Sequence, residues 1–309
     1  MTAPRLSTGY AASDTVAARE VEVDGIPMSA LCAEVSDPRA VLVAVHGGAT
    51  TSRYFDVPGR PRLSLLRVGA TLGFSVLAVD RPGYGSSAPW GDRFESPERR
   101  VDACFRSVDA LLAESARGAG VFLLGHSAGC DLAARMAADD RGDALLGLEL
   151  AGTGVRRHAE ASRIIEEMRH TRSAAGIRDL LWHPEHLYPP DVYGGKSLTC
   201  PSPRYEGAVV RDWPTEFPGL AGRVRVPVRF SYAEYERVWR SDPEALAEIA
   251  GFFTTAMRFV THEQTGSGHN ISVGFGAAAY HLGLLSFVEE CALPMIERPF
   301  DEICTRVPE

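Results

Sequence analysis

A serine in a glycine-flanked turn is the first residue in this chain whose setting suggests chemistry. The pentapeptide GHSAG, residues 125–129, follows the apolar run 121–124 and precedes a helix-like run of small and apolar residues. A passage from strand to helix in so few residues forces a strained backbone at Ser127 and pushes its hydroxyl outward. The hydroxyl then lies at a helix N-terminus, where free N–H groups can bind a developing oxyanion. The pattern therefore predicts that Ser127 is a nucleophile.

Two further motifs precede this serine in a recognisable order. The tripeptide HGG, residues 46–48, follows the apolar run 41–45, and DRPGYGSS, residues 80–87, follows the apolar run 74–79. Together with GHSAG they resemble the oxyanion loop, the D-x-P-G-x-G-x-S turn and the nucleophile elbow of the α/β-hydrolase superfamily. The resemblance spans residues 41–273, with a gap in the middle, and it implies the fold and a serine-dependent hydrolase activity.

A serine hydroxyl needs a base to take its proton, and the base needs an orienting carboxylate. The loop GHN, residues 268–270, follows the strand-like MRFV and precedes a helix expected to begin near Val273. It looks like the loop that carries the family's histidine, which makes His269 the general base and leaves His262, closer to the strand end, as a rival. In the family the acid follows an earlier strand, here VPVRFSY, which places Glu236 at that position and Glu234 as the alternative.

The same resemblance implies an oxyanion hole. It would be formed by the backbone N–H groups of Gly48 and Ala128, with Ala49 close enough to replace Gly48. His46 and His126 are expected to have structural roles. A serine at position 127, where dehalogenases and epoxide hydrolases would have aspartate, points to acyl transfer from esters, thioesters, lactones or amides.

The region from residue 154 to 224 interrupts the alternation of strands and helices and resembles the family's inserted cap. It is rich in proline and aromatic residues, which could line an acyl pocket or form the cap's own core. The candidates for substrate contact are Trp182, Tyr188, Tyr193 and Trp213, with Tyr205 and Phe217 as further aromatic residues of the region. The proline in HPEH, residues 183–186, breaks the helical spacing of a zinc site, so no metal and no other cofactor is expected. Cys130, inside the helix after the serine, is expected to pack in the core.

The elements around these motifs indicate an α/β fold with a mostly parallel sheet and helices on both faces. The turn Asp24-Gly25 separates two β-like runs and predicts an antiparallel hairpin at the N-terminal side of the sheet. Helices are expected over 62–72, from Pro97 with Ser96 as N-cap, and after Val273. The chain is expected to be one domain, 1–309, with the cap inserted at 154–224.

Composition excludes several classes of partner. The chain has 309 residues, 45% of them hydrophobic, and a net charge of −8, which argues against electrostatic binding to nucleic acid or to an anionic membrane. The sequence offers no apolar run of about twenty residues for a membrane span, and its six cysteines are scattered without CxxC spacing. We expect a cytoplasmic protein that acts on a small acyl substrate; a homodimer is left open.

The sequence thus predicts a serine hydrolase that uses Ser127, His269 and Glu236 through an acyl-enzyme on an ester, thioester or lactone. The enzymatic alternative is an acyltransferase or a macrocyclising thioesterase, because a substrate hydroxyl can replace water with the same three residues. A non-catalytic ligand-binding protein on the same scaffold is the alternative from a different class.

Overall fold

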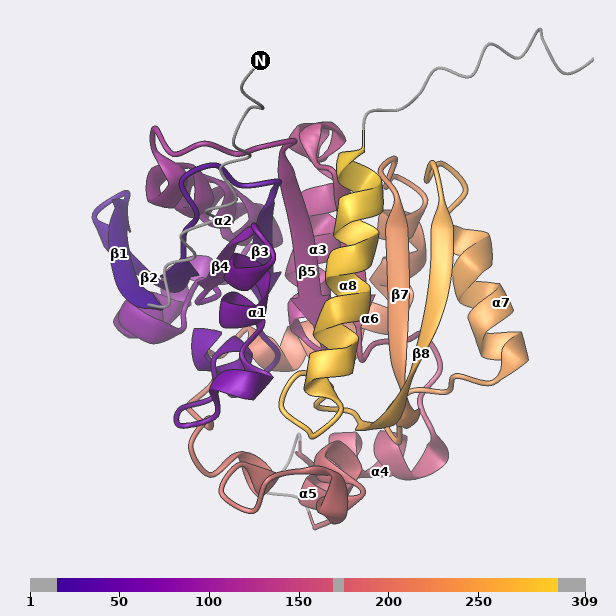
Figure 1. Ribbon diagram of the computed structural model, residues 1–309. Coiled ribbons are helices and arrows are strands. Elements are labelled where there is room, and N and C mark those ends of the chain that lie inside the picture. The colour runs from indigo at the N-terminus through magenta and orange to yellow at the C-terminus, as the bar shows by residue number, and fades with distance from the viewer. Residues whose placement is uncertain (1–15, 169–174, 294–309) are drawn as a thin grey trace, which may run out of the picture.

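One sheet of eight strands organises the molecule (Figure 1). The computed structural model describes residues 16–168 and 175–293. The strand order is β1-β2-β4-β3-β5-β6-β7-β8. The strands are β1 (Ala17–Val23), β2 (Ile26–Ala33), β3 (Val41–Val45), β4 (Ser75–Val79), β5 (Val121–His126), β6 (Gly147–Ala151), β7 (Val228–Tyr235) and β8 (Phe259–Gly268). From β4 through β3 to β8 all neighbours pair in parallel, whereas β2 is antiparallel to β1 and β4, as the sequence predicts.

The N-terminal hairpin has the turn that its sequence indicates. Asp24 has φ 53° and Gly25 has φ 73°. Left-handed backbone at both central residues is the geometry of a two-residue turn whose twist matches that of the flanking strands. Asp and Gly adopt this conformation at low cost, so the dipeptide fixes the register of β1 on β2.

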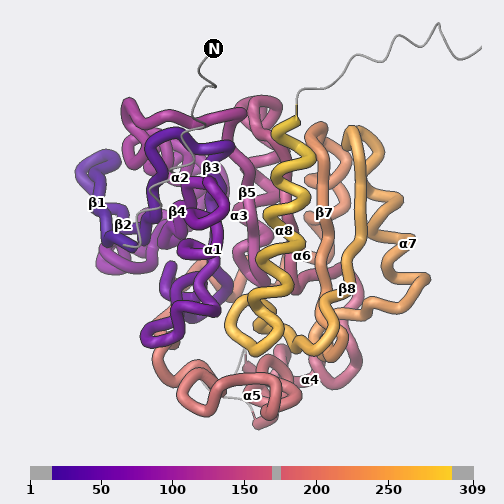
Figure 2. Tube along the Cα trace, in the orientation of Figure 1, coloured from indigo at the N-terminus to yellow at the C-terminus, as the bar shows by residue number. Residues whose placement is uncertain are grey.

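Helices cover the two faces of the sheet in separate groups, and in the tube view α8 lies in front of α3 and α6 (Figure 2). The helices α1 and α8 pack together on one face, and α2, α3 and α6 pack on the other, with α7 beside α6. The α-helices are α1 (Leu65–Thr71), α2 (Pro97–Leu112), α3 (Gly129–Ala137), α4 (Ala159–Met168), α5 (Ile177–Trp182), α6 (Glu206–Ala221), α7 (Pro243–Phe252) and α8 (Ala277–Ala292). Short 3-10 helices are η1 (Ser52–Phe55), η2 (Pro61–Leu63), η3 (Gly85–Phe94), η4 (Asp140–Ala144), η5 (Glu185–Leu187) and η6 (Tyr193–Gly195).

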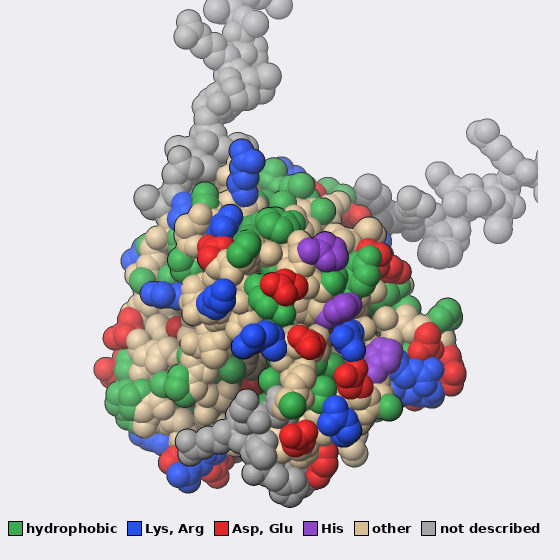
Figure 3. Space-filling view, turned by 90° about the horizontal axis from the view of Figure 1, so that it is seen from below, with side chains coloured by type: hydrophobic (Ala, Val, Ile, Leu, Met, Phe, Trp, Pro, Cys, Tyr) green, Lys and Arg blue, Asp and Glu red, His purple; other side chains and the backbone are tan. Residues whose placement is uncertain are grey.

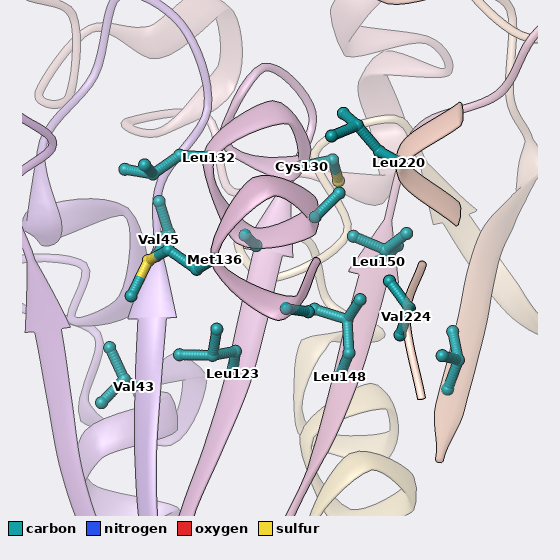
Figure 4. Packing of buried hydrophobic residues seen from close by; sticks show 14 of the residues in the cluster. Val43, Val45, Leu123, Cys130, Leu132, Met136, Leu148, Leu150, Leu220 and Val224 are labelled. Carbon is teal, nitrogen blue, oxygen red and sulfur yellow. The ribbon is translucent and has the colours of Figure 1, made fainter. Parts of the chain in front are cut away.

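Both faces of the central strands are buried, and alternate residues enter different parts of the core. In β3, Val43 and Val45 pack towards α2 and α3, whereas Leu42 and Ala44 belong to the cluster that includes α1 and α8. This period of two is the geometry of a strand buried on both sides, and it explains why the strand sequences are continuously apolar. Figure 4 shows the α3 side of this core, with Leu132 and Met136 close to the side chains of the strands.

Three boundaries differ from those expected. The strand at MRFV continues to Gly268, and the last helix begins at Ala277 rather than near Val273. The helix expected over 62–72 is α1, which starts at Leu65 after a 3-10 turn. The helix from Pro97 begins as predicted, and the Ser96 side chain accepts a hydrogen bond from the Arg99 backbone N–H.

The segment 154–224 divides into two parts. The elements α4, α5, η5 and η6 lie beyond the carboxyl ends of the strands, as Figure 1 shows for α4 and α5. Helix α6 instead packs on α3 and α7, and its Trp213, Phe217 and Leu220 join the main core. Within this segment, only the elements before α6 therefore lie over the edge of the sheet.

The outer face of this region carries side chains of both charges, interspersed over the surface (Figure 3). In the described part of the chain, no helix combines the length and the apolar character needed to cross a bilayer.

Candidate active site

Ser127 lies in the strained turn that its motif predicts. Its φ is 51°, in the left-handed region that few residues other than glycine adopt, and its backbone N–H donates to the Ala151 carbonyl at 2.8 Å. Gly129 allows α3 to begin against β3, because a Cβ there would lie 2.5 Å from the carbonyl oxygens of Val45 and His46. The strain is held by the packing of β5, β3 and α3, and the half-buried serine lies at the carboxyl edge of the sheet.

The structure brings together the three residues that the sequence singles out. The Ser127 Oγ lies 3.0 Å from His269 Nε2, and His269 Nδ1 lies 3.0 and 2.9 Å from the two carboxylate oxygens of Glu236. Ser127 follows β5, Glu236 follows β7 and His269 follows β8, so three parallel strands place these side chains at one edge of the sheet. This order of hydroxyl, imidazole and carboxylate allows the imidazole to take the hydroxyl proton while the carboxylate stabilises the resulting cation.

The carboxylate of Glu236 is well suited to remain charged. It is 9% exposed, and its Oε1 also accepts a hydrogen bond from the Val238 N–H at 2.8 Å. Burial alone would raise the pKa of Glu236, but attraction and hydrogen bonding to His269, together with backbone hydrogen bonds, outweigh burial and lower it. The alternative, Glu234, is exposed and accepts a hydrogen bond from the Gly266 N–H at 2.7 Å, away from the imidazole.

Two backbone N–H groups stand beside the serine without a partner. Among the described residues, neither Gly48 N–H nor Ala128 N–H has a protein acceptor, and a Cβ placed on Gly48 would lie 3.8 Å from the Ala128 Cβ. The Ala49 N–H, by contrast, donates to the Tyr84 hydroxyl at 3.3 Å. Of the two residues considered for the loop, Gly48 therefore has the N–H group available for an oxyanion.

His46 and His126 support the loops around the serine. His126 Nε2 lies 3.0 Å from both the Tyr54 hydroxyl and the His269 carbonyl oxygen, and its ring stacks on Tyr54. Burial, together with the neighbouring His269, lowers the pKa of His126 to about 3. His126 thus stays neutral and ties the serine turn to the backbone of the histidine loop.

The aromatic residues of the insertion occupy two different places. Trp182, Tyr188 and Tyr193 form edge-on contacts with ring centroids 5.1 and 6.4 Å apart, and Trp182 and Tyr193 are only half-buried. Trp213 lies in the core, stacked on Phe217, with its indole N–H donating to the Gly154 carbonyl at 3.0 Å. The half-buried pair can face a ligand, whereas the contacts of Trp213 are those of a core residue.

The other side chains that could do chemistry do not join Ser127, His269 and Glu236. His262 lies within β8, where its Nε2 is 3.3 Å from the Gln264 side chain. Cys130 is fully buried with its thiol on the Gly125 carbonyl, and burial raises the pKa of that thiol well above its usual range. Over residues 16–168 and 175–293, the His, Cys, Asp and Glu side chains nowhere form a group of three that could hold a metal ion.

Sequence reasoning missed one pair beside the oxyanion loop. Arg81, in the DRPGYG turn, forms a buried ion pair with Glu206 at the start of α6, with Nη2 to Oε1 at 2.8 Å. Arg81 lies in the DRPGYGSS motif, whereas no local signal marks Glu206, which is 125 residues further along the chain.

Comparison with known proteins places this chain in a family. A family model described as "Alpha/beta hydrolase family" matches residues 42–302. The chain belongs to the α/β-hydrolase family, and its sheet, N-terminal hairpin and flanking helices are those of the α/β-hydrolase fold.

The individual proteins that match this chain either cover only part of it or have low sequence identity to it. Protein ABHD14A from Danio rerio is 42% identical over 74 residues, which are 24% of this chain and 25% of that protein. A carboxyl esterase from Bacillus coagulans superposes with a TM-score of 0.63 and 17% identity over 90% of this chain and all of that one. A soluble variant of monoglyceride lipase from Saccharomyces cerevisiae gives 0.66 and 12%, and an N-acyl homoserine lactonase gives 0.64 and 17%, each over 91% of this chain and 98% of the other. At these identities, the solved structures are similar in fold alone.

Proposed function

We propose that this protein is a serine hydrolase that cleaves a carboxylic ester, thioester or lactone through an acyl-enzyme. The observation that carries the proposal is the hydrogen-bonded chain from Ser127 through His269 to Glu236, with 3.0 Å between hydroxyl and imidazole. Its support is chemical, because each group has the hydrogen-bond partner that its role requires.

In the proposed mechanism, Ser127 attacks the carbonyl carbon of the substrate as His269 Nε2 takes the hydroxyl proton. The carbonyl oxygen becomes an oxyanion and is held by the N–H groups of Gly48 and Ala128. Collapse of the tetrahedral intermediate breaks the ester bond, and His269 gives its proton to the leaving oxygen or sulfur. Water activated by the same imidazole then hydrolyses the acyl-enzyme and restores the serine.

The insertion is proposed to select the substrate. Trp182 and Tyr193 are half-buried on the segment that lies over the edge of the sheet, next to the loop of His269. The Asn270 side chain of that loop donates to the Leu181 carbonyl at 2.9 Å, which ties the aromatic group to the catalytic histidine. A small or medium acyl group is the proposed ligand, in a cytoplasmic setting consistent with the free state of the five described cysteines.

Labelling with a fluorophosphonate, followed by intact-protein mass spectrometry, tests the proposal. Wild type should gain one adduct, whereas Ser127→Ala and His269→Ala should gain none. Ser115→Ala is the matched control, because Ser115 is exposed and follows the end of α2 at the opposite edge of the sheet. On an aryl ester, Ser127→Ala should lose about 10⁴-fold or more of kcat.

An unlabelled wild type with no ester turnover would contradict the proposal and favour a ligand-binding role. Where turnover is found, analysis of products with water or an added alcohol as acceptor separates hydrolysis from acyl transfer or cyclisation, which the same triad can perform.

A further inference from the structure

The buried ion pair of Arg81 and Glu206 lies directly behind the oxyanion loop. The side chains are 3% and 10% exposed, and the contact is bidentate, with Nη1 3.1 Å from Oε2 and Nη2 2.8 Å from Oε1. Burial alone would lower the pKa of Arg81, but the carboxylate of Glu206 more than offsets this and raises it. The pair joins the turn after β4 to the first residue of α6.

Arg81 also donates a hydrogen bond to the backbone of the oxyanion loop, residues 46–48. Its Nη2 donates to the Gly47 carbonyl oxygen at 2.9 Å, and His46 Nδ1 lies 2.8 Å from the same oxygen. His46 Nε2 accepts the Arg81 backbone N–H at 3.0 Å, so Nε2 carries no proton and Nδ1–H is the donor. Burial and the charge of Arg81 lower the pKa of His46 well below its usual range, which keeps this ring neutral.

The orientation of that carbonyl determines where the neighbouring N–H points. The Gly47 C=O and the Gly48 N–H belong to one peptide bond, which is trans because the single cis bond of the described chain is at His183-Pro184. In a trans peptide the two groups point in opposite directions. Two donors on the carbonyl oxygen therefore fix the orientation of the Gly47-Gly48 peptide, and the described residues provide no acceptor for its N–H.

We propose that Arg81 and Glu206 are positioning residues for the oxyanion hole: Glu206 fixes the guanidinium, and the guanidinium fixes the Gly47-Gly48 peptide with its N–H facing the reacting oxygen. The inference rests on the proposed hydrolase function. It deepens that function by making the start of α6, which follows the substrate-selecting insertion, a support of the reacting site. Neither residue is required to touch the substrate.

The position of the carboxylate adds a second consequence. A Cβ on Gly48 would lie 2.8 Å from Glu206 Oε1, so this carboxylate is adjacent to the place where negative charge develops. Paired with Arg81 it is neutralised, but alone it would oppose the oxyanion. Loss of Arg81 alone is therefore expected to impair catalysis more than loss of both partners.

The test compares Arg81→Met, the double variant Arg81→Met/Glu206→Leu, and the control Arg106→Met, which breaks the exposed ion pair of Arg106 with Asp24. Removing one partner of a buried pair is strongly destabilising, whereas an apolar replacement of both is tolerated, so the double variant supplies folded protein without the pair. For each protein, kcat and KM on an aryl ester are normalised to active sites titrated with the fluorophosphonate. The inhibition constant Ki of a trifluoromethyl ketone, which forms an oxyanion on the serine, is measured in parallel.

The double variant should lose about tenfold in kcat, because an oxyanion donor contributes about 10²–10³ and is here misdirected rather than removed. Its KM should stay within about twofold, and its Ki should rise by the same factor as kcat falls, a correspondence that a merely structural defect would not produce. Arg81→Met should lose about 100-fold where it folds, and Arg106→Met should match wild type.

A double variant with the wild-type kcat and Ki would overturn the positioning role while the hydrolase assignment stands. A wild type that neither turns over esters nor reacts with the fluorophosphonate would overturn both.

Discussion

Replacing Glu236 by glutamine should disable the site while leaving its shape intact. Unit charges about 4 Å apart at an effective dielectric of about 20 attract by about 4 kcal/mol, which corresponds to a factor of about 10³ in rate. The glutamine N–H₂ group can also face His269 Nδ1, which would favour the imidazole tautomer that cannot accept the Ser127 proton. The analogous acid-to-amide change in a serine protease triad lowers kcat by about 10⁴. Glu236→Gln should therefore lose about 10³–10⁴-fold in kcat.

The matched control is Glu234→Gln, two residues away. Glu234 is exposed, and its hydrogen bond from the Gly266 N–H does not reach the imidazole. In steady-state kinetics on an aryl ester, the kcat of this variant should be within about twofold of wild type, because a substitution on the surface has little effect on the rest of the molecule. Far-UV circular dichroism confirms that both variants fold. Equal losses in both variants, or a loss below about tenfold for Glu236→Gln, would refute the assigned acid.

Two further predictions concern stability. Gly129→Ala should cost about 1–3 kcal/mol in urea unfolding, because the added Cβ would lie 2.5 Å from the carbonyl oxygens of Val45 and His46. Gly251→Ala in α7, with nothing within 4 Å, should be neutral or stabilising, and equal effects would contradict the packing argument. His281 is fully buried, its ring nitrogens have no partner among the described residues, and burial lowers its pKa from 6.5 to about 3. Because the unfolded chain takes up this proton below about pH 6.5 and the folded chain does not, the free energy of unfolding should fall by up to about 1.4 kcal/mol per pH unit between about pH 6.5 and 3. In His281→Leu, the free energy of unfolding should depend less on pH over this range. Equal pH dependence in the variant and in wild type, measured by urea unfolding, would contradict the prediction.

The sequence predicts the residues of the candidate site because each stands in a local pattern. The strain at Ser127 is signalled by the adjacent glycines and the strand before them, and the φ of 51° confirms the strained turn. Continuous apolar runs mark the buried parallel strands, so β3, β4 and β5 begin within a residue of their expected starts. The resemblance to the family predicts the acid at Glu236, after the strand that is β7, and the structure places this carboxylate beside the imidazole of His269.

The remaining features depend on contacts between distant segments. From Thr261 onward β8 has no apolar side chain, Glu263 is exposed and only part of the strand is buried, because β8 is at the edge of the sheet and lacks the apolar run of a central strand. Trp213 and Glu206 are both on α6, yet one enters the core and the other contacts Arg81; the sequence does not show where that helix packs.

The order of the strands has a consequence for how this protein could be altered. In the sheet, β4 lies on one side of β3, whereas β5 and the strands after it lie on the other side. The direction in which successive strands are added to the sheet therefore reverses between β3 and β5. Loops that leave two such strands diverge and open a crevice between them. The HGG loop follows β3 and the serine turn follows β5, so both leave the sheet at this point, and the connectivity of the strands decides where they meet. A chimaera in which the segment between β6 and α6 is replaced by that of another member of the family should keep Ser127 in place. It should differ in which molecules reach this serine.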